Sequence, residues 1–81
     1  MVIQVDGIYV GKQPYFIDLI GKIENPKFKH LDKKGKTNNT IFFETDAEDA
    51  DMAKALVKKT IKADPQGAVM YFRVMEEGKT F

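Results

Sequence analysis

The sequence contains no cysteine and no serine, and it has a single histidine, His30. Without cysteine, the chain can form no disulfide, no thiolate metal site and no cysteine nucleophile. Without serine it has no serine-hydrolase chemistry, and one imidazole cannot build a site of two or more histidines. No apolar run is long enough for a membrane span, and residues 1–6 do not resemble a signal peptide. We therefore expect a cytoplasmic protein without a disulfide framework.

The composition predicts a folded protein. Of its 81 residues, 43% are hydrophobic and 31% are charged, and the formal net charge is only +1. We expect residues 1–81 to form a single α+β domain, with a frayed tail over residues 76–81. A chain of this size has a thin core and little apolar material for a deep pocket. We therefore expect a protein that is not an enzyme and that holds no cofactor.

Several segments have the composition of β-strands. Residues 2–5 and 8–10 flank Asp6-Gly7, which predicts either a hairpin or one bulged strand. Residues 40–44 are β-branched and aromatic, and residues 68–75 alternate between two faces, so both are predicted strands. Residues 27–39, which precede residues 40–44, start with alternation and become polar, which indicates a short edge strand and an exposed loop.

Residues 15–23 fit two structures. With a period of 2 the segment is a strand, and with a period of 3.6 it is a helix that starts at Pro14 and ends at Asn25-Pro26. We favour the strand because tyrosine, phenylalanine and isoleucine are crowded together and Gly21 lies inside the segment.

Residues 46–63 predict a helix, since apolar side chains recur there at intervals of three and four. Acidic residues gather at its start and lysines at its end, which complements the partial charges of the helix termini. We expect a single-layer antiparallel or mixed sheet of four to five strands packed on this one helix, in the order β-β-β-β-α-β. The final strand should lie beside the strand that ends at Glu44.

Three patterns that suggest chemistry have simpler explanations. Gly-Lys-Thr occurs at residues 35–37 and 78–80, but neither copy has the upstream glycine or the following helix of a phosphate-binding loop. His30 and Asp32 could act together as a general base, but no serine, cysteine or second histidine can join them. The acidic cluster lacks the ligand spacing of a calcium loop and suits a helix start, so we expect no metal; it comprises Glu44, Asp46, Glu48, Asp49 and Asp51.

One helix covers only one face of a sheet, so the other face should be half apolar and open. Such a face either docks a partner or is covered by the ambiguous segment. We expect this face, or an open edge strand, to bind an unknown protein partner or a second copy of the chain. Its side chains are Phe42, Tyr71, Arg73 and Met75.

The lysine-rich segment 27–36 suggests an alternative function. The segment contains five lysines and a single acidic residue, and aromatic rings are interleaved with the lysines. This mixture could neutralise phosphates and stack on bases, although lysines also commonly protect an edge strand. The alternative is weak, sequence-tolerant nucleic-acid binding through Lys27, Phe28, Lys29, His30, Lys33, Lys34 and Lys36.

Overall fold

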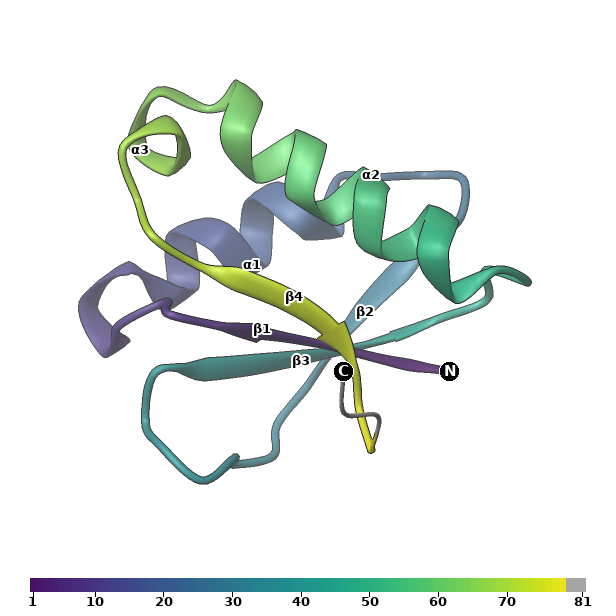
Figure 1. The fold of residues 1–81 in the computed structure, drawn as a ribbon, viewed down its shortest axis with the longest axis horizontal. Coiled ribbons are helices and arrows are strands. Elements are labelled where there is room, and N and C mark those ends of the chain that lie inside the picture. The colour runs from purple at the N-terminus through teal and green to yellow at the C-terminus, as the bar shows by residue number, and fades with distance from the viewer. Residues whose placement is uncertain (79–81) are drawn as a thin grey trace.

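Helices pack on one side of a four-stranded antiparallel sheet (Figure 1). The structure is a computed structural model and describes residues 1–78. The strands lie in the order β2-β3-β1-β4. In chain order the elements are β1 (Val2–Asp6), the short 3-10 helix η1 (Val10–Lys12), α1 (Gln13–Gly21), β2 (Phe28–Leu31), β3 (Thr40–Thr45), α2 (Ala50–Ala63), α3 (Pro65–Ala68) and β4 (Arg73–Glu76).

The α+β class is confirmed, but the arrangement differs from the expected one in two respects. Two helices of more than one turn, α1 and α2, cover the sheet instead of one. The last strand, β4, pairs with β1 and not with β3. The main elements follow the order β-α-β-β-α-β of the split β-α-β arrangement. Because many unrelated functions share such arrangements, this topology alone does not indicate a function.

The core lies between the helices and the sheet. Ile3 and Val5 of β1 are fully buried there, opposite Phe43 and Ile41 of β3 in the register. Residues that lie opposite each other on neighbouring strands point to the same face of the sheet. These four side chains therefore all point to the face that the helices cover. The helices supply the other side of the core through Phe16, Ile20, Ala53, Val57 and Ile61.

The preference for a strand at residues 15–23 was wrong. Gln13–Gly21 is α1, and Pro14 lies in its first turn, where a missing backbone N–H costs nothing. Phe16 and Ile20, four residues apart, form the buried stripe that the helical reading predicts. Gly21 is the last residue of the helix, so it does not interrupt the pattern.

The helix predicted over residues 46–63 is confirmed with a later start. Asp49 precedes α2, and its side chain accepts a hydrogen bond from the backbone N–H of Asp51 at 2.9 Å. After α2, the side chain of Asp64 accepts one from the backbone N–H of Gln66 and begins the short α3. The expected strand over residues 68–75 therefore starts only at Arg73.

The segment after β1 forms no hairpin. Gly7 has a φ of 97°, as a tight turn at Asp6-Gly7 requires, but the chain then leads into η1 and α1. A Cβ on Gly7 would lie 2.6 Å from the carbonyl oxygen of Tyr71. Glycine thus allows the chain before β4 to pass close to the end of β1. At the other end of the chain, Glu76 belongs to β4, and residues 79–81 of the expected tail lie outside the described residues.

Candidate functional site

The loop of residues 32–39 between β2 and β3 bends below the sheet face that lies away from the helices (Figure 1) and contacts the middle of that face. Lys33 of this loop forms an ion pair with Glu77, and its Nζ lies 5.0 Å from the ring centre of Phe42. Gly35 packs so closely on Phe42 and Thr40 that a Cβ there would lie 3.2 Å from atoms of each. The loop therefore shields the middle of this face from solvent.

The expectation of an open sheet face is wrong for its centre. Phe42 is 3% exposed and Met75 is 8% exposed. Tyr71 is 96% exposed but precedes β4 instead of lying within it. Arg73 is on β4, and its guanidinium lies 3.9 Å from a carboxylate oxygen of Asp6. Of the four residues, only Tyr71 and Arg73 offer accessible side chains, and both belong to the β4 end of the sheet.

The lysine-rich segment is divided between several environments. Phe28 is only 5% exposed, so it cannot stack on a base in this conformation. His30 is exposed and places its ring against the edge of Phe43, with 5.8 Å between the centroids. Lys33 is held by Glu77 and Phe42. Four lysines of the segment are exposed, and their side chains have no partner among residues 1–78: Lys27, Lys29, Lys34 and Lys36.

Two hollows border the covering loop. One, of about 350 Å³, includes His30 and Asp32 and lies between the loop and the start of α1. The other, of about 860 Å³, is open and includes Asp6, Lys34 and Lys36.

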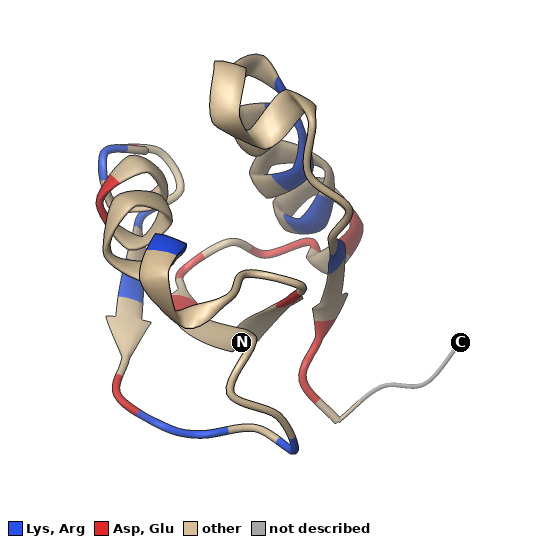
Figure 2. Ribbon diagram, turned by 90° about the vertical axis from the view of Figure 1, so that its left-hand side faces the viewer, with Lys and Arg blue, Asp and Glu red and all other residues tan. Residues whose placement is uncertain are grey.

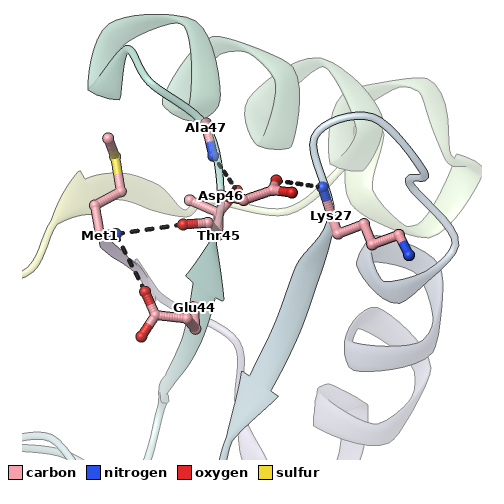
Figure 3. A network of polar contacts seen from close by, with 6 residues as sticks. All are labelled: Met1, Lys27, Glu44, Thr45, Asp46 and Ala47. Carbon is pink, nitrogen blue, oxygen red and sulfur yellow. Dashed lines mark hydrogen bonds and ion pairs between the residues drawn. The ribbon is translucent and has the colours of Figure 1, made fainter.

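The acidic cluster has a structural role at the start of α2 (Figure 3). Glu44 accepts a hydrogen bond from the amino group of Met1 at 3.1 Å, and Asp46 accepts one from the backbone N–H of Lys27 at 2.9 Å. Asp49 caps α2, as described above. Within residues 1–78, no group of three or more metal-ligating side chains comes together.

The second feature of interest is the outer edge of β4. The N–H of Glu77 donates to the carbonyl of Val2, so Val2 and Glu77 form a hydrogen-bonded pair of the β1–β4 ladder. Along an antiparallel ladder, hydrogen-bonded pairs alternate with pairs that are not hydrogen-bonded. The backbone groups of Met75 and Arg73 therefore bond to β1, opposite Gln4 and Asp6. The N–H and C=O groups of Val74 therefore point away from β1, toward the edge of the sheet that no strand of residues 1–78 covers. We call this the free edge of β4.

A groove runs between this edge and α2. It has a volume of about 400 Å³ and most of its lining is apolar. Phe72 and Val74 contribute apolar surface on the strand side, since Val74 pairs with the helix-facing Val5. The residues that line it are Lys54, Ala55, Lys58, Phe72, Arg73 and Val74. We call this feature, together with the outward backbone of Val74, the β4 groove.

The β4 groove has a basic wall. Figure 2 shows the lysines of α2 on the part of the helix that lies above β4. Lys54 is 3.3 Å from a carboxylate oxygen of Asp51. By contrast, Lys58 and Lys62 have no carboxylate within ion-pair distance among residues 1–78, and the Nζ of Lys62 lies 5.7 Å from the ring centre of Phe72. Lys58 in the groove lining and Lys62 next to the groove, over the ring of Phe72, therefore supply two ammonium groups without a carboxylate partner among residues 1–78.

Sequence reasoning missed this groove. A signal was present, because Lys54, Lys58 and Lys62 recur every four residues and so share one side of a helix. The lysines at the helix end were interpreted only as complements to the helix termini. Their position relative to Phe72 depends on the pairing of β4 with β1, which the expected topology did not contain.

Two exposed apolar side chains precede β4. Val69 is 86% exposed and Tyr71 is 96% exposed, and both lie between α3 and the strand. Neither lines the β4 groove. Single exposed apolar residues are common on protein surfaces, so we assign these two no role in the groove.

The pKa shifts of this protein lie outside the β4 groove. Tyr15 donates a hydrogen bond of 2.5 Å to Asp64. This bond is the main reason why the pKa of Asp64 is lowered and the pKa of Tyr15 is raised from their ordinary values. The pair joins α1 to the junction between α2 and α3, so its role is structural.

No helix of residues 1–78 combines the length and the apolar character that crossing a membrane requires. Comparisons with models of protein families, with curated proteins and with solved structures find no match to this chain.

Proposed function

We propose that this protein is a binding module that takes up an extended segment of a partner protein as an additional strand on β4. The single observation that carries the proposal is the free edge of β4, where the backbone groups of Val74 point outward beside a groove of about 400 Å³. Main-chain hydrogen bonds to an edge give such complexes their affinity, and neighbouring grooves give them specificity. The β4 groove, with Phe72, and its basic wall supply those neighbouring contacts.

The edge of β4 has only part of the usual protection against this kind of pairing. Natural edge strands are commonly blocked by being very short, by charged side chains, by proline or by a bulge. β4 is short and has a charged residue at each end, Arg73 and Glu76. The four residues of β4 contain no proline, and their register with β1 is continuous from Ile3–Glu76 to Asp6–Arg73. The central residue, Val74, places an apolar side chain toward α2. An added strand would therefore find both hydrogen-bonding groups and apolar contact.

A peptide selection tests the proposal. A display library of random twelve-residue peptides is selected on the intact protein, and the enriched peptides are measured against the Val74→Pro variant. Proline at this position removes the outward N–H of Val74, and edge strands tolerate proline where the N–H faces solvent. We expect the enriched peptides to lose at least tenfold in affinity on this variant.

A second measurement avoids any change in the protein. N-methylation of alternate amides in an enriched peptide blocks one edge of the bound strand and leaves the other edge free. We expect one set of methylated amides to abolish binding and the other set to have little effect. Enriched peptides that bind Val74→Pro normally and tolerate both methylation patterns would refute strand addition, and so would a selection that enriches no peptide.

Nucleic-acid binding through the lysine-rich segment is a second proposal with less support. It uses the exposed Lys34 and Lys36 beside the larger hollow, but the burial of Phe28 and the ion pair of Lys33 remove two of its expected contacts. Its affinity should fall steeply with added salt. If no single- or double-stranded oligonucleotide is shifted at about 50 mM salt, a condition that favours phosphate contacts, this proposal fails.

A further inference from the structure

We infer that the segment bound at β4 carries two carboxylates at positions i and i+2, which face Lys58 and Lys62 of α2. This inference rests on the proposed strand addition and names the chemistry of the partner. It follows from the two ammonium groups that have no ion-pair partner among residues 1–78 and from the match between two structural repeats.

The two lysines have the spacing that an extended partner can meet. Residues four apart on an α-helix are separated by about 6 Å along its axis. Residues two apart on a strand share a face and are separated by about 6.6–6.8 Å. Figure 1 shows α2 passing above β4 in the opposite direction. Since the two repeats agree within about 1 Å, carboxylates at i and i+2 of an added strand can each reach one lysine.

The acidic pattern should not extend to a third position near Lys54. That lysine is already 3.3 Å from Asp51. Glu76, at the same end of β4, is in register with the helix-facing Ile3 and so adds a negative charge on the side of α2. A third carboxylate would meet these acidic groups. The preferred segment is therefore acidic beside the start of β4 and not beside its end.

A second copy of this chain is the less favourable occupant of the same edge. Two β4 edges that pair in antiparallel fashion would form one continuous sheet and place both α2 helices on the same side. Lys58 and Lys62 of one copy would then face the same lysines of the other. Like charges at such short range repel, whereas carboxylates would relieve the charge of this wall.

The test compares two blocked synthetic peptides built on the strongest sequence from the selection. One carries aspartates at i and i+2, and the other carries the same residues with the aspartates at i and i+1. Adjacent residues of a strand point to opposite faces, so the second peptide can present only one carboxylate to α2. We expect it to bind about 2- to 5-fold more weakly, the effect of one exposed ion pair.

Lysine variants test whether the lysines of α2 cause the preference for carboxylates at i and i+2. Lys58→Gln and Lys62→Gln should each reduce the preference for the i, i+2 peptide, and about 0.5 M NaCl should weaken it through screening. Lys59→Gln is the matched control, because Lys59 lies on the same helix about 100° away from Lys58, does not line the groove, and is not placed over the ring of Phe72 as Lys62 is. It should leave the preference unchanged.

The possible failures are distinguishable. If both peptides bind equally well and still require Val74, the inference about spacing is wrong and the proposed function stands. If neither depends on Val74, strand addition itself is wrong. If a twenty-residue oligothymidylate binds through Lys58 and Lys62 without dependence on Val74, the basic wall is a nucleic-acid site and both proposals fall.

Discussion

The hydroxyl of Tyr15 donates a 2.5 Å hydrogen bond to Asp64, which joins α1 to the point where α2 ends and α3 begins. Both side chains are near solvent, and the pair is separated by 49 positions in the sequence. It therefore connects the two helices on one side of the sheet. We expect Tyr15→Phe to lower the melting temperature slightly, as measured by circular dichroism.

The contribution of this pair should depend on pH in a defined direction. Since the folded pKa of Asp64 is lowered, its contribution is present above the unfolded pKa and is lost as the pH falls through the folded pKa. Since the folded pKa of Tyr15 is raised, its contribution is lost as the pH rises through that value. The difference in melting temperature between the wild type and Tyr15→Phe should be largest between about pH 5 and about pH 9. A difference that stays constant from pH 3 to pH 11 would contradict this explanation.

Substitution of Gly67 is predicted to destabilise the fold. A Cβ at this residue of α3 would lie 1.9 Å from the carbonyl oxygen of Ile61, in the last turn of α2. We expect Gly67→Ala to lower the free energy of unfolding by about 1–3 kcal/mol in urea titrations, because backbone must move. The control is Gly21→Ala, because this residue is helical and an added Cβ would meet no atom within 4 Å beyond its chain neighbours and the backbone of its own helix. That variant should be neutral or more stable by about 0.5–1 kcal/mol, and equal effects of the two variants would argue against the close contact.

The covering loop makes Phe42 a core residue. Its replacement by alanine should lower the free energy of unfolding by about 3 kcal/mol, at the lower end of the usual range because the loop can partly collapse into the space. Tyr71→Ala should stay within about 0.5 kcal/mol of the wild type, since Tyr71 is 96% exposed. If Phe42→Ala were as harmless as Tyr71→Ala, the sheet face would be open after all.

The capping role of Asp49 is testable in the same way. Its side chain accepts the hydrogen bond from the N–H of Asp51 at the start of α2. Asp49→Ala should therefore cost about 1 kcal/mol of stability in thermal or urea unfolding. Glu48→Ala removes a neighbouring negative charge without removing the cap, and it should change stability by less than about 0.5 kcal/mol. Equal losses would mean that general charge, and not the cap, stabilises this helix start.

Regular periodicity was the reliable part of the sequence. α2 was predicted because its apolar residues repeat every three to four positions, and β3 because β-branched and aromatic residues are concentrated there. Residues 15–23 were ambiguous because both periods fit them. The helix is decided by the burial of Phe16 and Ile20 in the core, where α1 packs on α2 and β2. Such long-range packing cannot be read from nine consecutive residues.

The errors around the sheet come from contacts between distant residues. Residues 68–72 alternate like a strand, but Asp64 begins α3 and Gly67 packs on Ile61, so pairing starts later. The cover over Phe42 depends on Lys33 and Glu77, which lie 44 positions apart. No local pattern predicts an ion pair of that separation. For the same reason, the sequence shows the regular spacing of the lysines on α2 but does not predict that β4 lies beside them.

The central place of β1 in the sheet affects how the chain reaches its folded state. Ile3 lies opposite both Phe43 and Glu76, partners that are distant in the sequence. Closing such long loops costs entropy before any contact compensates for it, so domains dominated by distant pairings fold more slowly than helical bundles. α2 has a strong local pattern and needs no distant strand to begin. We therefore expect the arrival of β4 at β1 to be a late event in folding, and the edge that we assign to binding to be among the last parts of the molecule to be completed.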